Sequence, residues 1–251
     1  MTIKLYNIDI YYIMPFRIIR NKNGYFVENI ETGKRFSKRP MTEKSAIKQF
    51  KILNKYLHIL EGSGMNRGEI QDANYKALTD LDIKKHLGDD VKIISHQDLK
   101  DYKTIEDILP NKKDVAVIIW ESKPNYGHWT ILLRYIDEET HKPTIEYFDS
   151  YGYPINEPLK WVNKKYKKSI DESPYLLPIL KDAQNRYDII YNSKNLQNRK
   201  EDVATCGRHC ISRAISIMKY NQSLSNYIKM MNEIKNTTGF DYDSAVSQMV
   251  N

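Results

Sequence analysis

The sequence has few cysteines and no long apolar run, and both shortages narrow what the chain can be. Its 251 residues contain two cysteines, Cys206 and Cys210, four residues apart. Such spacing suits a structural disulfide poorly, and secreted domains that depend on bridges usually carry more cysteines. No apolar stretch approaches the ~20 residues that span a bilayer, and the N-terminus shows no small-residue cleavage site. We therefore expect a protein of a reducing compartment that is neither secreted nor transmembrane.

Internal repeats and low-complexity tracts are also missing, and the composition that remains is globular. Hydrophobic residues make up 41% and charged residues 28%, which suits one large domain or a domain with a small appendage. Lysine and arginine exceed aspartate and glutamate, so the formal net charge is +7. This charge favours weak, salt-screened contact with nucleic acid. Because the lysines are scattered, we slightly favour a basic surface that is merely solvated.

The first 90 residues are predicted to form an accessory module that is too small for a large core. Residues 24–36 alternate apolar and polar around a Thr-Gly turn, which is the pattern of a short hairpin. Thr42 offers an N-cap for a following helix. Residues 61–69 are Gly-rich and polar, which is typical of a linker. We therefore divide the chain into an N-terminal accessory segment, 1–90, and a main domain, 91–251.

The main domain alternates predicted strands with predicted helices. The strands are expected at 114–120, 128–136, 143–149 and 187–192. The helices are expected at 158–168, 174–184, 206–219 and 223–234. The first three strands follow one another closely, so they indicate the centre of a sheet.

A base and its orienting partner can be placed from strand pairing alone. If 128–136 and 143–149 form an antiparallel hairpin closed near residue 139, His128 lies opposite Asp149. Directly opposed residues have Cβ atoms ~5 Å apart, which is near enough for a carboxylate to accept a hydrogen bond from an imidazole. Asp149 would then fix the tautomer of His128 and favour its protonated form.

A nucleophile is offered by Cys206, at the predicted start of a helix. The positive end of the helix and a nearby imidazolium both stabilise a thiolate. Gly207 would leave the approach to the sulfur free of a side chain. An oxyanion formed at an attacked carbonyl needs donors, and the backbone N–H of Cys206 is one candidate. The side-chain amide of Gln197 is a second.

Four short sequence motifs contain these residues, in the order His, Asp, Gln, Cys. They are GHW at 127–129, EYFDSYG at 146–152, YNSKNLQ at 191–197 and TCGRHC at 205–210. Together they resemble the adenovirus-type maturation proteases and their relatives, a clan that also contains the SUMO-specific Ulp proteases. The motif sequences are most similar to those of the proteases of large DNA viruses, virophages and Polinton-type elements. The resemblance covers roughly residues 92–250, and four blocks in fixed order are a stronger signal than one motif.

The resemblance implies an α+β fold of the papain-like, Ulp and adenain type, a mixed central sheet flanked by helices. It implies His128 as general base, Asp149 as its orienting acid and Cys206 as nucleophile. Gln197 would be the oxyanion-hole donor, and Trp129 would line a narrow substrate channel. The expected activity is a cysteine endopeptidase that cleaves capsid precursors, with relatives cutting next to glycine. DNA and a peptide are cofactors of adenoviral members, although this sequence requires none.

Two rival functions remain open at this stage. A Ulp-like isopeptidase would use the same chemistry to remove a ubiquitin-like modifier. A basic DNA-binding packaging or capsid-associated protein would keep the fold without the activity. A viral protease of this kind is expected in the virion and the host-cell cytoplasm, and a monomer is the default.

The other side chains of the cysteine motif have simpler interpretations. Cys210, one turn after Cys206, is predicted to be a small buried hydrophobe. His209 is predicted to lie on the surface, because no carboxylate is evident to orient it. A zinc site from Cys206, His209 and Cys210 would crowd three ligands onto one turn without an evident fourth, so no metal is expected.

Overall fold

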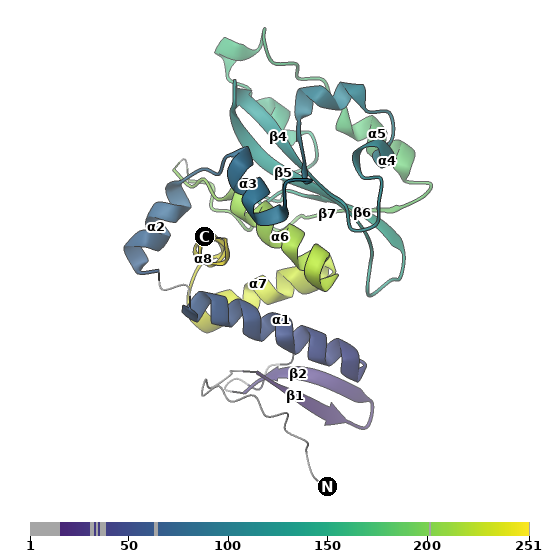
Figure 1. The fold of residues 1–251 in the computed structure, drawn as a ribbon, viewed down its shortest axis with the longest axis vertical. Helices are drawn as coiled ribbons and strands as arrows, with labels where there is room; N and C mark the ends of the chain where they lie inside the picture. The colour runs from purple at the N-terminus through teal and green to yellow at the C-terminus, as the bar shows by residue number, and fades with distance from the viewer. Residues whose placement is uncertain are drawn as a thin grey trace. The chain divides into compact units, whose positions relative to one another are not determined.

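The fold was analysed in a computed structural model of the chain (Figure 1). The structure describes residues 16–30, 33, 35, 39–62, 65–200 and 202–250. The chain divides into two compact units, Met1–His58 and Ile59–Asn251. The division therefore lies between His58 and Ile59 and not after residue 90.

The first unit contains a hairpin and most of a helix. Strands β1 (Phe16–Asn21) and β2 (Gly24–Asn29) pair antiparallel across a two-residue turn, with Gly24 at a φ of 138°. The hairpin thus turns earlier than the sequence indicated, and Thr32 of the expected turn lies outside the described residues. Helix α1 (Glu43–Gly62) begins as predicted after Thr42, whose hydroxyl accepts the Ser45 N–H at 3.2 Å.

The second unit is built on a five-stranded mixed sheet in the order β3-β4-β5-β6-β7. Its strands are β3 (Lys92–Ser95), β4 (Val115–Lys123), β5 (Tyr126–Ile136), β6 (Pro143–Phe148) and β7 (Asp188–Tyr191). The three central strands pair antiparallel, and each edge strand pairs parallel to its neighbour. The four predicted strands are confirmed, and β3 is an addition. The class is therefore α+β.

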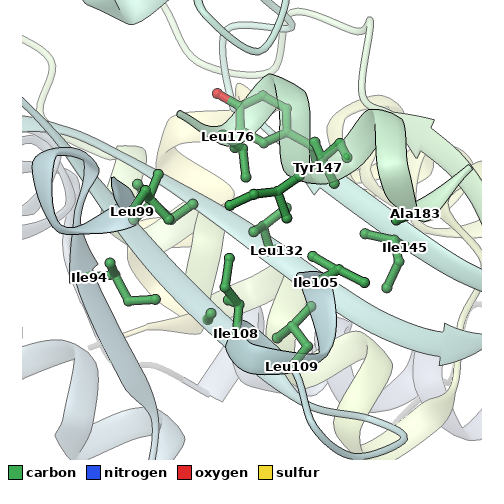
Figure 2. Packing of buried hydrophobic residues seen from close by; sticks show 14 of the residues in the cluster. Ile94, Leu99, Ile105, Ile108, Leu109, Leu132, Ile145, Tyr147, Leu176 and Ala183 are labelled. Carbon is green, nitrogen blue, oxygen red and sulfur yellow. The ribbon is translucent and has the colours of Figure 1, made fainter. Parts of the chain in front are cut away.

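One face of the sheet carries the main apolar core. The short helix η1 (His96–Asp101), α4 (Ile105–Ile108) and α5 (Leu176–Ala183) cover this face. Figure 2 shows Ile105 close to Leu132 and Ile145 of the central strands. Fully burying one such aliphatic side chain stabilises the fold by ~1.5–3 kcal/mol. This packing holds β5 and β6 in place, and both strands lead to the candidate site.

The other face is covered by α6 (Cys206–Tyr220), which packs along β5. Helices α7 (Leu224–Thr238) and α8 (Tyr242–Met249) follow, and α8 packs against both α6 and α7. Helices α2 (Arg67–Tyr75) and α3 (Asp80–Leu87) pack on α8 and α6, so both belong to the second unit. No helix within the described part of the chain is both long and apolar enough to cross a membrane.

Two expected elements differ in the structure. The expected helix 158–168 is replaced by two short 3₁₀ segments, η2 (Glu157–Trp161) and η3 (Lys164–Tyr166). Asn163 starts the second one, because its side chain accepts the Lys165 N–H at 3.0 Å. This local hydrogen bond competes with a continuous helix.

The predicted linker at 61–69 is shorter than expected. Helix α1 runs to Gly62, and α2 begins at Arg67. Asn66 and Glu69 form a capping box, with the Glu69 carboxylate 2.7 Å from the Asn66 N–H. The Asn66 and Glu69 pair is a helix-start signal that the Gly-rich composition obscured.

Candidate active site

His128 of β5 and Asp149, which follows the end of β6, meet as predicted. His128 Nε2 is 3.1 Å from Asp149 Oδ1. The register differs from the expected one, because β5 pairs Ile131 with Phe148, so Asp149 continues the ladder opposite Thr130. His128 and Thr130 point to the same face of the sheet, and such diagonal neighbours remain within reach of long side chains. The contact therefore forms across a diagonal.

Asp149 accepts two further hydrogen bonds, one at its carboxylate and one at its backbone carbonyl. Its Oδ1 also accepts the backbone N–H of Tyr151 at 2.7 Å, and its carbonyl oxygen accepts Asn192 Nδ2 at 2.6 Å. Asp149 and Asn192 are fully buried. Among the described residues, Asp149 Oδ2 has no hydrogen-bond partner. A buried carboxylate with so few donors favours a cation beside it, here the protonated form of His128.

Cys206 is the first residue of α6 and lines the same cleft as His128, whose imidazole interacts with its thiol. Because His128 Nε2 contacts Asp149, Nδ1 is the nitrogen that is left for the sulfur. Burial raises the pKa of Cys206, but the hydrogen bond and charge of His128 outweigh it. The backbone amides of Trp129 and Gly207 add to this effect, so the pKa lies below its ordinary value.

The pKa of His128 moves in the opposite direction. Burial lowers this pKa, but the charge and hydrogen bond of Asp149 outweigh it, and Cys206 contributes in the same sense. The pKa of His128 is thereby raised to about 10. The lowered pKa of Cys206 and the raised pKa of His128 both favour a thiolate beside an imidazolium. This is the reactive form of a cysteine nucleophile.

Gln197 lies in the same cleft as Cys206 and is almost completely buried. Its Oε1 accepts the hydroxyl of Ser150 at 2.7 Å, and its Nε2 donates to the carbonyl of Val203 at 3.0 Å. These contacts fix which end of the amide is the donor. An amide nitrogen carries two hydrogens, so Nε2 retains donor capacity beyond Val203.

Trp129 and Gly207 both pack against Leu78 beside Cys206. The indole N–H of Trp129 donates to the carbonyl of Leu78 at 3.0 Å. A Cβ at Gly207 would lie 3.2 Å from Leu78 Cβ and 3.3 Å from Trp129 Cδ1. Gly207 therefore serves the close packing of Leu78 against α6, whereas Trp129 itself lines the cleft.

The segment before α3 was not expected at the site. Arg208 Nη1 donates to the carbonyl of Lys76 at 2.6 Å, and the Ala204 N–H donates to the carbonyl of Asn74 at 2.8 Å. Together with the Trp129 contact, these bonds attach residues 74–78 to the region around Cys206. The sequence had assigned this segment to the accessory part of the chain.

His209 was wrongly predicted to be a surface residue. It is fully buried, and its Nε2 is 3.2 Å from Asp243 Oδ1. Asp243 belongs to α8, so this carboxylate approaches from a part of the chain that the motif does not include.

The predicted burial of Cys210 is confirmed. It is fully buried, its Sγ donates to the carbonyl of Trp129 at 3.4 Å, and burial raises the pKa of its thiol. Both Cys206 and Cys210 are free thiols.

Two aromatic side chains that the sequence argument missed flank His128. The ring of Tyr151 stacks on the imidazole with centroids 4.9 Å apart, and Trp161 meets it edge-on at 5.3 Å. A face of an aromatic ring attracts a cation, so the stacked Tyr151 supports the imidazolium form. Tyr151 belongs to the EYFDSYG motif, so its place beside Asp149 in the sequence was the available signal. Trp161 comes from a separate 3₁₀ segment, η2.

These groups line one cleft of about 1460 Å³. Its acidic lining residues are Asp80, Glu121 and Asp202. No lysine or arginine occurs among the described residues that line it. The local charge is therefore opposite in sign to the net charge of +7.

The chain is similar to the uncharacterized protein V9 of Sputnik virophage. The two are 34% identical over 163 residues, which is 61% of this chain and 88% of that protein. No protein-family model matches the chain.

Proposed function

The chain belongs to the family of the virophage protein V9, and from the geometry of its cleft we propose that it is a cysteine peptidase. The observation that carries this proposal is the buried His128–Asp149 pair in the cleft of Cys206, whose thiol pKa the imidazole lowers. A nucleophile, a base and an orienting acid within hydrogen-bond reach are the arrangement that nucleophilic acyl transfer needs.

The proposed fold relationship is papain-like. The nucleophile begins a helix, α6, that packs along the strand carrying the histidine, β5. The N-terminal end of α6 adds its partial positive charge to that of the imidazolium. We propose that this packing is what brings Cys206 and His128 together.

The first chemical step in this proposal is attack by the Cys206 thiolate on a peptide carbonyl. The carbonyl oxygen becomes an oxyanion, which the Cys206 N–H and the free hydrogen of Gln197 Nε2 would stabilise. Loss of one such donor typically lowers a rate ~10²–10³-fold. The contacts of Gln197 to Ser150 and Val203 support this role, because they fix the donor end of the amide in a residue that lines the cleft.

The second step expels the amine. Protonated His128 gives its proton to the leaving nitrogen, and the C–N bond breaks to leave a thioester on Cys206. His128 then takes a proton from water, which attacks the thioester and releases the acid. Asp149 keeps the imidazole in one orientation throughout.

A polypeptide suits this cleft better than a nucleic acid. Three carboxylates line the cleft, and they would repel a phosphate backbone. We propose that the substrates are structural precursor proteins of a virion, and chiefly its capsid precursors. Contact with DNA through the scattered lysines outside the cleft remains a separate prediction.

The proposal is tested by alkylating the wild-type protein with iodoacetamide between pH 4 and 9. Peptide mass spectrometry would report each cysteine separately, with His128→Ala measured beside the wild type. We expect Cys206 to react rapidly well below pH 8 in the wild type and to behave as an ordinary thiol in the variant. An ordinary profile in both proteins would contradict the activated pair.

Cleavage is tested by co-expressing the chain with the capsid protein of the same genome. We expect the wild type to shorten the precursor and Cys206→Ala to leave it intact. Precursor cleavage by Cys206→Ala would show that the nucleophile is wrongly assigned. Labelling by a ubiquitin or SUMO vinyl sulfone, without precursor cleavage, would instead favour an isopeptidase.

A further inference from the structure

Asp243 of α8 is a buried carboxylate that receives three hydrogen bonds. Its Oδ2 accepts the backbone N–H of Asn198 at 2.8 Å. Its Oδ1 accepts the hydroxyl of Thr205 and lies 3.2 Å from His209 Nε2. The residue is 2% exposed. A carboxylate removed from water in this way is stable only because several donors replace the lost hydration.

The three donors belong to the two segments that carry the proposed oxyanion donors. Asn198 directly follows Gln197, and Thr205 directly precedes Cys206. His209 lies within the first turn of α6 after the nucleophile. One side chain from α8 therefore joins the loop of Gln197 to the start of α6.

The position of Thr205 supports this connection. It occupies the N-cap of α6, where a threonine hydroxyl usually accepts an N–H from the first turn. Here the side chain makes no such capping bond, and the hydroxyl donates to Asp243 instead. The N–H groups at the start of α6 are thus left without a side-chain cap, which is what an oxyanion site needs.

Within the described structure, Asp243 makes no hydrogen bond or ion pair with Cys206, His128 or Gln197. The thiol of Cys206 is stabilised by His128 and by the amides of Trp129 and Gly207. Removing a negative charge near Cys206 favours the ionised form of its thiol. Loss of Asp243 should therefore affect oxyanion stabilisation and leave formation of the thiolate intact.

We infer that Asp243 is a positioning residue that sets the geometry between Gln197 and the Cys206 amide, an inference that rests on the proposed cysteine peptidase function. The contact with His209 explains the burial of this histidine, since its Nε2 needs an acceptor inside the fold. In this role His209 acts through Asp243 and not as a second base.

Two reactions of the 251-residue chain separate this role from a general loss of structure. Iodoacetamide is attacked at an sp³ carbon, iodide leaves, and no oxyanion forms. N-acetylglycine p-nitrophenyl ester is attacked at a carbonyl, passes through an oxyanion and releases p-nitrophenolate as the thioester forms. Both probes report on Cys206, with Cys206→Ala as the blank for each.

The test compares Asp243→Asn and Thr205→Val with the wild type. Asn retains the shape of Asp but replaces one acceptor oxygen with a donor, so it cannot accept from all three partners. We expect Asp243→Asn to lower the ester rate ~10-fold or more, with the alkylation rate at Cys206 within about twofold of the wild type. Thr205→Val removes one of the three donors. It should show the same split between a lowered ester rate and an unchanged alkylation rate, with a smaller fall in the ester rate.

Ser247→Ala is the matched control on the same helix. The Ser247 hydroxyl is buried without a hydrogen-bond partner in the described structure. Its removal should leave both rates unchanged. Thermal unfolding of every variant shows whether it is folded at the assay temperature.

The outcomes distinguish this inference from the proposed function. A wild type without Cys206-dependent ester cleavage would overturn the proposed function and this inference with it. An active wild type with unchanged ester rates in Asp243→Asn and Thr205→Val would overturn only the positioning role. A parallel fall in both rates, with a lower melting temperature, would also overturn it, because it would mean that Asp243 serves stability alone. If Asp243→Asn does not fold, the split in Thr205→Val decides.

Discussion

Arg213 of α6 and Glu146 of β6 form a bidentate ion pair with no exposed surface. Arg213 Nε donates to Oε1 at 2.7 Å, and Nη2 donates to Oε2 at 2.6 Å. The hydroxyl of Tyr135 donates to the same Oε2 at 2.6 Å. The pair connects the helix that begins at Cys206 to the strand that leads to Asp149.

Breaking this pair should destabilise the fold strongly. Glu146→Gln leaves the Arg213 charge buried without a counter-charge, which typically costs ~3–5 kcal/mol of the free energy of unfolding. Urea denaturation followed by circular dichroism measures the loss. Glu172→Gln is the control, because it breaks the partly exposed pair with Lys167 and should cost only ~0–1 kcal/mol. Equal losses in the two variants would contradict a structural role for the buried pair.

Asp149→Asn should reduce the reactivity of Cys206 at acidic pH. The charge of Asp149 is the largest favourable contribution to the raised pKa of His128. Without it the imidazole is less protonated, so the thiolate loses its partner. We expect the iodoacetamide rate of Cys206 at pH 6 to fall ~10-fold or more, which is the effect of one pKa unit or more.

Asp188→Asn is the control for this measurement. Asp188 is an exposed carboxylate on the edge strand β7, so its loss removes the same charge away from the cleft. We expect its alkylation profile to match the wild type. If Asp149→Asn also kept the wild-type rate at pH 6, His128 would not depend on Asp149 for its charge.

The contact between His128 and Asp149 could be predicted because it depends on local pattern. Two adjacent strands with a short polar turn allow few pairings. The observed register places Asp149 opposite Thr130, two residues from His128, and a shift of two keeps both side chains on one face. The place of Cys206 at the start of a helix was readable for the same reason. The prediction of a helix at 158–168 was wrong, because the local cap formed by Asn163 was not weighed against helical periodicity.

The contributions of Leu78 and Asp243 could not be predicted from the sequence. Both reach the site from segments far from Cys206 along the chain, and no local periodicity encodes such packing. The burial of His209 was missed because α6 is buried on nearly all sides, with polar residues paired internally. A helix of this kind lacks the polar stripe that periodicity arguments use.

Cys210 should remain unmodified when Cys206 reacts. Its thiol is fully buried, and burial raises its pKa, so the reactive thiolate is scarce up to pH 9. We expect iodoacetamide to label Cys206 alone in the folded protein and both cysteines equally in urea. Cys210→Ala should keep the alkylation rate of Cys206 within about twofold. Labelling of Cys210 in the folded protein at pH 8 would show that this part of α6 opens.

Trp129→Phe should loosen the segment that forms one wall of the cleft. The substitution keeps an aromatic ring but removes the indole N–H that donates to Leu78 at 3.0 Å. The carbonyl of Leu78 then loses a buried partner, which costs ~1–3 kcal/mol. Local opening of the segment should therefore become ~10-fold more frequent or more. Hydrogen exchange of the peptide that covers residues 74–79 measures this change.

Trp120→Phe is the matched control for the wall. It removes an indole hydrogen bond of similar geometry, from Trp120 to the hydroxyl of Thr130 at 2.7 Å, but that bond lies within the sheet. Both variants should lose comparable global stability, whereas only Trp129→Phe should accelerate exchange at 74–79. Equal exchange of this peptide in both variants would mean that Arg208 and Ala204 hold the wall without Trp129. Faster exchange in Trp129→Phe alone would make the Trp129 hydrogen bond the contact that keeps the wall closed beside Cys206.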